Sequence, residues 1–219
     1  MIGITLTGAD ERTRISDLVR LRMMGAEIGL LLTHSPDGRN RYPSLGWIWE
    51  AATELQGHAA LHVCGQRARQ TLFEGGYKNL LKWFGRIQVN GDPSPGAIKD
   101  LCQRYDTKVV ITQYPLNDST LEMDDIYCNH ALLVDGSGGR GISPEKWERP
   151  ATSKLVGFAG GLGPENLATE LPKIAAVADD EGDWWVDMEG NLRDNDDLFN
   201  VSRAEKALAV FLKWREENQ

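Results

Sequence analysis

Short apolar runs alternate with amphipathic segments from one end of the chain to the other, and this alternation limits the possible folds more than any other feature. Such a pattern predicts parallel strands joined by helices, so we expect an α/β protein with eight strands and eight helices. The expected strands lie near Ile2 to Leu6, Glu27 to Leu32, Ala59 to Val63, Arg86 to Val89, Val109 to Thr112, Ala131 to Val134, Leu155 to Ala159 and Trp184 to Val186. This order is compatible with either a closed barrel or a doubly wound sheet.

Two observations favour a closed (β/α)8 TIM barrel. No Gly-x-Gly-x-x-Gly follows the first strand, so the dinucleotide-binding fingerprint of a doubly wound sheet is missing. Polar residues recur at the C-terminal ends of several strands instead of at one switch point. The length of 219 residues fits one barrel of eight βα units. We therefore expect a single barrel domain over residues 1–219.

Some of the expected helices carry local start signals. Ser94 and Pro95 indicate where one helix begins, and Ser202 with Glu205 forms a capping-box pair at the start of the last helix. The fifth unit is the weakest, because the segment from 118 to 127 is short and acidic. We expect only a rudimentary helix there.

Charge and cysteine content narrow the class of protein. A formal net charge of -8 argues against general nucleic-acid binding, because phosphate backbones require clustered Lys and Arg. The cysteines, Cys64, Cys102 and Cys128, are odd in number and far apart, which is typical of a reducing compartment and not of a disulfide framework. The chain shows neither a signal peptide nor a membrane span, so we expect a cytoplasmic protein with no membrane partner.

Residues two apart on a strand share a face, so the sequence also predicts which side chains point into the barrel. The polar residues that share the expected inner face are Thr5, Thr7, His62, Cys64, Gln88, Asn90, Asp135 and Asp187. Several of them come at strand ends, near the mouth where barrel active sites lie. Each alone could be a hydrogen-bonded core residue, but the set favours a site.

Asp135 is the sharpest candidate for chemistry. It follows Ala-Leu-Leu-Val and precedes Gly-Ser-Gly-Gly-Arg-Gly, so its carboxyl group is expected on a partly apolar rim. A carboxyl group in that position can serve as a proton donor. The alternative role is to cap the glycine-rich loop by accepting backbone N–H bonds.

The turns after the last two strands predict a phosphate site. Gly160-Gly161-Leu162-Gly163-Pro164 joins the seventh strand to a helix, and Asp187-Met188-Glu189-Gly190-Asn191 follows the eighth strand. Glycines allow an anion to approach the backbone, and a helix start supplies N–H donors. We therefore expect a small phosphorylated, sugar-type ligand, with a plain tight turn as the alternative reading of the glycines.

These motifs resemble those of the phosphoribosylanthranilate isomerase family. Residues 131–141 are similar to that family's sixth-strand motif, an apolar strand that ends in Asp before a Gly-Gly-x-Gly loop. Residues 160–166 are similar to its Gly-Gly-Leu-x-Pro-Glu-Asn block. Residues 87–91 are similar to its Val-Gln-Leu-His-Gly, with Asn90 where His is usual. Strand order and spacing agree over nearly the whole chain.

The resemblance implies an Amadori rearrangement of N-(5′-phosphoribosyl)anthranilate in tryptophan biosynthesis. It implies no cofactor, and we assign no metal site. In that family an aspartate protonates the sugar ring oxygen and a cysteine removes the C2′ proton. By resemblance Asp135 is the general acid and Gln88 contacts the substrate. The expected phosphate-binding backbone groups are those of Gly139, Gly141, Gly160, Gly161 and Gly190.

The catalytic base is where the chain departs from the family. Thr7 stands at the position of the family's cysteine, and a threonine hydroxyl is a very weak base without an activating partner. Cys64, at the mouth of the third strand, could supply a relocated base if its thiolate were stabilised. The alternative for Cys64 is a small buried hydrophobic residue.

The ligand-binding side chains also differ. Met188 and Glu189 replace a double serine, and Glu189 would place a negative charge near the phosphate unless it turns away. Arg39 and Arg41 are the candidate counterparts of the family's Arg after the second strand, and we assign Arg41 to the substrate.

Two further functions remain open on sequence grounds. One is a metal-dependent phosphosugar epimerase or lyase on the same barrel, with ligands among His34, His62, Cys64, Asp135 and Asp187. The other is a non-catalytic barrel that binds a phosphorylated metabolite, which loss of the base residue favours. Either a monomer or a homodimer is compatible with the sequence.

Overall fold

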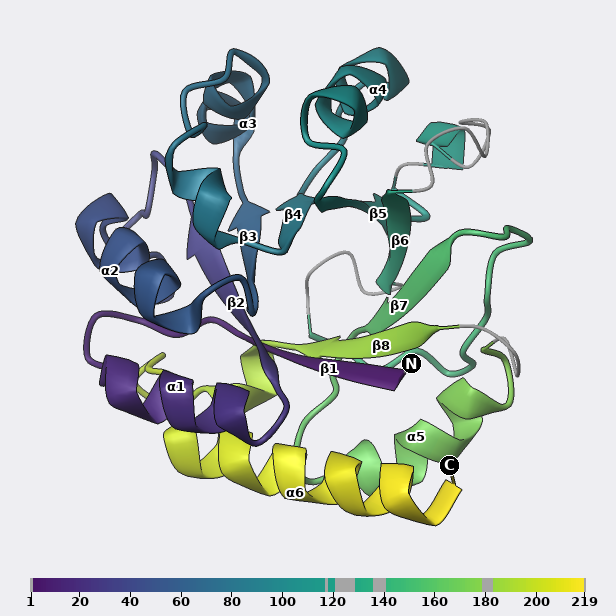
Figure 1. Cartoon of the computed structure of the whole chain (residues 1–219). Coiled ribbons are helices and arrows are strands. Elements are labelled where there is room, and N and C mark those ends of the chain that lie inside the picture. The colour runs from purple at the N-terminus through teal and green to yellow at the C-terminus, as the bar shows by residue number, and fades with distance from the viewer. Residues whose placement is uncertain (1, 117, 121–128, 136–140, 179–182, 219) are drawn as a thin grey trace.

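Eight parallel strands form a closed barrel in sequence order, and β1 pairs with β8 to complete the ring (Figure 1). The computed structural model describes residues 2–116, 118–120, 129–135, 141–178 and 183–218. The strands are β1 Ile2–Thr7, β2 Glu27–Leu32, β3 Ala59–Val63, β4 Arg86–Val89, β5 Val109–Tyr114, β6 His130–Asp135, β7 Leu155–Ala159 and β8 Trp184–Met188. The expected (β/α)8 barrel is confirmed, and the closed ring excludes a doubly wound sheet.

Four strands extend further toward the mouth than the sequence pattern predicts, and one of them is β5, which ends at Tyr114 instead of Thr112. β1 continues to Thr7, β6 includes Asp135 and β8 continues past Asp187 to Met188. These side chains are therefore held by strand backbones and not by loops. Residues fixed on strands are positioned more firmly than residues on loops.

Helices cover most of the barrel wall (Figure 1). They are α1 Ile15–Met23, α2 Leu45–Leu55, α3 Gln66–Phe73, α4 Pro95–Arg104, α5 Leu167–Ala175 and α6 Val201–Asn218, with short 3-10 helices η1 Leu80–Trp83, η2 Asp118–Thr120 and η3 Gly190–Leu192. Residues 141–154 after β6 form no α-helix, so the expectation of a helix there is wrong. After β5, residues 118–120 form η2, and residues 121–127 of the expected rudimentary helix lie outside the described residues. No helix among the described residues is long and apolar enough to cross a bilayer.

An irregular segment covers the barrel where a sixth-unit helix was expected. Its Trp147 is 3% exposed and packs edge-on against Phe158 of β7, with ring centroids 6.1 Å apart. The indole Nε1 donates a hydrogen bond of 2.7 Å to Glu170 of α5. One large aromatic side chain thus buries the strand surface that a helix would otherwise cover.

Helix starts follow the expected signals at α4 but not at α6. Ser94 accepts a hydrogen bond from the backbone N–H of Ala97, and Pro95 occupies the first helical turn. At α6 the capping-box prediction is wrong, because Asn200 accepts the N–H of Arg203 at 3.1 Å and takes the cap position. Glu205 instead forms an ion pair with Arg20 of α1.

The barrel interior is filled by a cluster distinct from the layer between strands and helices. Its buried members are Ile111, Ala131, Leu133, Ala159 and Trp185. Trp185 fits because the neighbouring strand carries Gly157, where a Cβ would lie 2.2 Å from the indole ring. The Arg86 guanidinium lies over the same ring, 4.7 Å from its centroid. A glycine on β7 therefore makes room for the largest side chain inside the barrel.

Gly157→Ala is expected to destabilise the protein by roughly 1 to 3 kcal/mol, because the new methyl group overlaps Trp185 and neither strand can move away. Urea unfolding at constant pH measures the change. The matched control is Gly46→Ala in α2, where a Cβ meets nothing within 4 Å. That control should be neutral or stabilising by up to about 1 kcal/mol. Equal effects at both sites would contradict the packing described here.

Candidate active site

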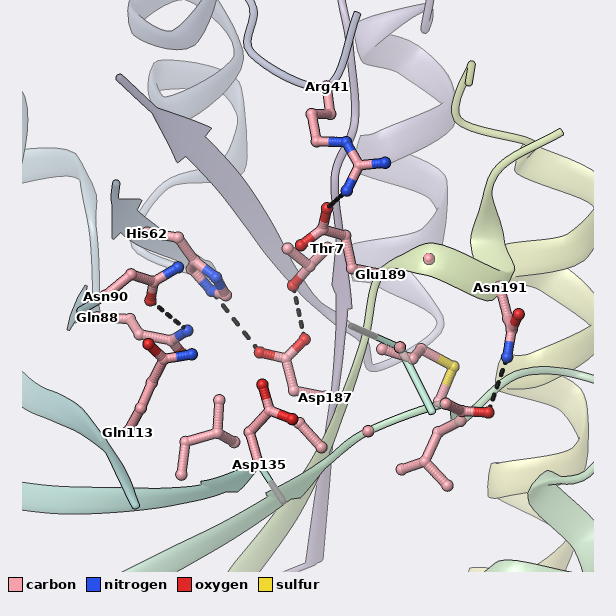
Figure 2. A pocket seen from close by; sticks show the side chains of 18 residues that line it. Thr7, Arg41, His62, Gln88, Asn90, Gln113, Asp135, Asp187, Glu189 and Asn191 are labelled. Atoms are coloured by element: carbon pink, nitrogen blue, oxygen red, sulfur yellow. Dashed lines mark hydrogen bonds and ion pairs between the residues drawn. The ribbon is translucent and has the colours of Figure 1, made fainter. Parts of the chain in front are cut away.

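A cavity of about 330 Å³ opens at the C-terminal mouth of the barrel (Figure 2). Each of the eight strands contributes through its C-terminal end or the loop that follows it, and the second unit does so through Arg41 of the loop after β2. The lining residues are Thr7, Arg41, His62, Gln88, Asn90, Gln113, Leu133, Asp135, Gly141, Ala159, Gly160, Gly161, Leu162, Asp187, Met188, Glu189, Gly190 and Asn191. Most of the polar residues expected on the inner face therefore lie around one pocket.

Strand register brings two carboxyl groups to the same level of the pocket. Asp135 pairs with Ala159 across β6 and β7, and Ala159 pairs with Asp187 across β7 and β8. The backbones of the two aspartates are thus separated by two strand spacings, roughly 10 Å. The small side chain of Ala159 between them leaves space, and both carboxyl groups point into the pocket (Figure 2).

Asp187 accepts a short hydrogen bond from Thr7. The distance from Thr7 Oγ1 to Asp187 Oδ1 is 2.7 Å, and both residues are buried. Gly29 on β2 makes room for Thr7, because a Cβ there would lie 2.1 Å from the hydroxyl oxygen. Burial raises the pKa of the Asp187 carboxyl to about 7, and the Thr7 hydroxyl opposes part of that rise. Asp187 can therefore both accept and release a proton near neutral pH.

His62 lies next to Asp187 as a neutral ring. Its Nε2 is 3.8 Å from Asp187 Oδ2, which is too long for a hydrogen bond. Burial, with a smaller effect of Arg86, lowers the pKa of His62 to about 3. Gln88 donates to Asn90 at 2.9 Å, while Gln88 Oε1 and His62 Nε2 are buried with no hydrogen-bond partner in the described structure. Both orphaned atoms belong to residues that line the pocket.

Cys64 is not among the residues that line the cavity. It is 8% exposed, and its Sγ accepts a hydrogen bond from Asn90 Nδ2 at 3.2 Å. Burial raises the pKa of its thiol to about 12, so the group stays protonated at neutral pH. These features fit the small buried hydrophobic residue better than a relocated base.

Arg41 is held between two carboxylates. Its Nη1 lies 2.6 Å from Glu189 Oε1, and its Nη2 lies 2.7 Å from Asp197 Oδ1. Burial raises the pKa of Glu189, and Arg41 counteracts that rise. Glu189 therefore turns toward Arg41 and Thr7, whereas Asn191 lies apart from them (Figure 2).

The glycine turns that follow β7 and β8 meet at the part of the pocket formed by these two strands. Gly160 and Gly161 both have positive φ, at 122° and 61°, which residues with side chains rarely adopt. The Gly161 carbonyl accepts hydrogen bonds from Asn166 Nδ2 at 2.9 Å and from Asn191 Nδ2 at 2.7 Å. Asn191 thus ties the two turns together. Gly141 and Gly190 also line the cavity, whereas Gly139 lies outside the described residues.

Two polar residues of this pocket, Gln113 and Asn191, were not predicted as site residues from the sequence. A third, Asp187, was predicted on the inner face but without its hydrogen-bond partner. Gln113 shares the inner face of β5 with Ile111, a signal that strand parity contained, and it accepts the Gly91 N–H at 3.0 Å. The position of Asn191 depends on a contact 30 residues away and has no local signal. Asp187 was expected on the inner face, but its hydrogen bond to Thr7 could not be read from the sequence.

Of the five residues named for a metal site, His62, Asp135 and Asp187 line the pocket, and His34 and Cys64 do not. His34 lies outside the pocket lining, with its Nε2 2.8 Å from the hydroxyl of Tyr77. Among the residues that the structure describes, no group of three or more His, Cys, Asp or Glu is arranged to hold a metal ion.

Comparison with known proteins points to one family. The N-(5′-phosphoribosyl)anthranilate isomerase of Methanothrix thermoacetophila is 29% identical over 103 residues, 43% of this chain. That match spans 49% of the relative, or about half its length. The resemblance to phosphoribosylanthranilate isomerase is confirmed. No family model matches the sequence.

Solved phosphoribosylanthranilate isomerases share the fold over almost the whole chain. The crystal structure from Thermus thermophilus has a TM-score of 0.68 at 19% identity and covers 97% of this chain and 100% of that one. The structure from Thermotoga maritima has a TM-score of 0.65 at 15% identity with the same coverage. A phosphoribosylanthranilate isomerase in complex with reduced 1-(o-carboxyphenylamino)-1-deoxyribulose 5-phosphate gives 0.67 at 15% identity. At these identities the likeness describes the fold.

Asp187→Asn is expected to make the free energy of unfolding less dependent on pH. Because the folded pKa of about 7 exceeds the unfolded value of about 4, the native state holds the extra proton between these pH values. Wild-type stability from this group therefore falls as pH rises from 4 to 7. The variant avoids that loss, so its stability relative to wild type should rise by up to about 4 kcal/mol across this window.

Urea unfolding at pH 5, 6, 7 and 8 measures this difference. The matched control is Asp92→Asn, which changes the same chemical group at an exposed position. A variant-minus-wild-type difference that stays flat for Asp187→Asn would show that Asp187 ionises normally in the folded protein.

Proposed function

We propose that the protein is an isomerase of the phosphoribosylanthranilate isomerase type, which converts an N-substituted aminoaldose phosphate into the corresponding aminoketose. The observation that carries the proposal is the pair of carboxyl groups, Asp135 and Asp187, at one level of a pocket with glycine turns beside them. Isomerisation of this kind needs an acid and a base on one substrate and no external oxidant. The tryptophan pathway implied by the resemblance requires in addition that the amine be anthranilate.

The glycine turns support a phosphate at the side of the pocket formed by β7 and β8. Gly160, Gly161 and Gly190 line the cavity without side chains that would block a close approach to the backbone. Glu189, which sequence reasoning placed near the phosphate, pairs with Arg41 and so does not oppose an anion on the Gly160 side. Backbone N–H groups in glycine turns donate effective hydrogen bonds to a phosphate.

In the proposed reaction Asp135 is the general acid. Its carboxyl group donates a proton to the ring oxygen of the aminofuranose, and the bond between that oxygen and C1 breaks. The lone pair of the substituent nitrogen forms the C1=N bond at the same time. The product of this step is an open-chain iminium ion with the aldose skeleton intact.

Asp187 takes the role that a cysteine on β1 has in the family. Its carboxylate accepts the proton from C2, and the C2–H electrons form the C1=C2 bond while the C=N pair returns to nitrogen. The resulting enol then loses its hydroxyl proton and gains a proton at C1, which gives the ketone at C2. Thr7 is a positioning residue in this scheme, because its hydroxyl donates to Asp187 and orients the carboxylate.

Asp135→Asn and Asp187→Asn are each expected to lower kcat by at least about 100-fold, the usual contribution of a positioned acid or base. The substrate is made in situ from C2-labelled ribose 5-phosphate and 2-aminobenzoate or 2-aminobenzamide. Appearance of the C2 ketone signal in 13C NMR measures turnover. Absence of turnover of either amine by the wild-type protein would overturn the proposed function.

The matched comparison for the base is Cys64→Ala. Because Cys64 is a buried thiol outside the pocket lining, this change should alter kcat by no more than a few-fold. Full activity in Asp187→Asn together with loss in Cys64→Ala would return the role of base to the cysteine.

Thr7→Val should change the pH profile more than the maximal rate. Activity is expected to rise with pH as Asp187 ionises, with a midpoint near 7. Valine has the shape of threonine but removes the hydroxyl that lowers the pKa of Asp187, so the midpoint should move up by roughly 0.5 to 1 pH unit. kcat/KM measured from pH 5 to 9 tests this. An unmoved midpoint with a lower plateau would mean that Thr7 acts only through packing.

A further inference from the structure

The two ends of the pocket differ in charge. Asn191, which bonds to the Gly161 carbonyl, lies apart from the Arg41 and Glu189 pair (Figure 2). A sugar phosphate that carries phosphate on C5 and nitrogen on C1 has these groups at opposite ends of its chain. With the phosphate on the glycine turns, the substituent on nitrogen therefore extends toward Arg41 and Glu189. This assignment rests on the proposed function.

Arg41 is the one permanently cationic side chain among the described residues that line the pocket. Its two terminal nitrogens are both engaged, with Glu189 at 2.6 Å and Asp197 at 2.7 Å. Each terminal nitrogen thus gives one of its donors to a protein carboxylate, while Arg41 Nε is buried without a hydrogen-bond partner in the described structure. What the two protein carboxylates remove is the net positive charge of Arg41 and not its capacity to donate.

The groups around Arg41 add negative charge. Glu189 and Asp187 both line the pocket, and Glu189 also packs close to the end of β1, where a Cβ at Gly8 would lie 3.1 Å from its Cγ. A carboxylate on the ligand would meet these two groups, while the nearby cations Arg41 and Arg193 are each already paired with protein carboxylates. Like charges brought together in a partly buried site oppose binding strongly.

Strands β3 and β4 bring neutral hydrogen-bonding groups to the same pocket. Gln88 Oε1 and His62 Nε2 are buried without hydrogen-bond partners in the described structure. The imidazole is neutral at physiological pH, so neither atom brings a charge. An oxygen acceptor of this kind pairs with an amide or hydroxyl donor and has nothing to offer a carboxylate.

We propose that the Arg41–Glu189 ion pair makes this pocket selective for an aminoaldose phosphate whose nitrogen substituent is uncharged. Glu189 is the specificity-determining residue, since it neutralises Arg41 inside the cavity, and Asp197 does so from outside the lining. The preferred amine presents a neutral donor, such as a carboxamide, where anthranilate presents a carboxylate.

Two nearly isosteric amines test the selectivity. 2-Aminobenzamide and 2-aminobenzoate are each combined with ribose 5-phosphate, and kcat/KM is measured for the two adducts with the full-length protein. The wild-type protein is expected to favour the benzamide adduct by at least about tenfold. Glu189→Gln, which keeps the shape of the side chain and leaves Arg41 paired with Asp197 alone, should shift the ratio toward the benzoate adduct by about tenfold. The double variant with Arg41→Gln should lose that shift.

The control is Glu50→Gln, which removes one negative charge at an exposed position on α2 and should leave the ratio unchanged. Equal use of the two adducts by wild type, or preference for the benzoate adduct, would overturn the selectivity and leave the isomerase intact. An unchanged ratio in a folded Glu189→Gln protein would overturn the role of Glu189. Turnover of neither adduct would instead overturn the proposed function and the selectivity with it.

Discussion

The hydrogen bond from Thr7 to Asp187 is the interaction on which the rest of the site depends. Its partners are 180 residues apart, and they meet because β1 pairs with β8 to close the barrel. Gly29 on β2 leaves the space that Thr7 occupies. The closure that completes the fold therefore also orients the buried carboxyl group, and an open sheet would leave Asp187 without its donor.

The environment of Asp187 lowers stability and supports chemistry for the same reason. A carboxyl group paired with arginine ionises easily, as Asp17 does, where hydrogen bonds from Arg20 and Arg14 lower the pKa. Asp187 has a neutral hydroxyl as its hydrogen-bond donor and a neutral imidazole nearby, so burial dominates and its pKa rises to about 7. A carboxyl group that titrates near neutral pH is a costly core residue but a suitable proton acceptor.

Strand parity and periodicity were enough to predict the barrel and the ring of polar residues at its mouth. Asp135 and Thr7 could be placed because alternation along a strand is a local property. The ion pair between Arg41 and Glu189 could not, since 148 residues separate its members and the loop after β2 follows no periodic pattern. The irregular segment that covers β7 could not be predicted for a similar reason. Trp147 covers the strand through contacts with Phe158 and Glu170, and such tertiary contacts produce no periodic pattern in the sequence.

One side of the pocket is lined by backbone atoms and the other by side chains. This difference affects how the specificity of such a site changes in evolution. The glycine side offers backbone atoms, and its shape is fixed by amide side chains such as Asn166 and Asn191 that bond to the Gly161 carbonyl. Replacing one lining side chain there changes little of what a phosphate would contact. The opposite side is made of side chains, and there Glu189 and Asp197 compensate the positive charge that Arg41 would present. Under the proposed function, a barrel of this design keeps the groups assigned to the phosphate and to the acid, while single substitutions change the amine it accepts and the residue that serves as base.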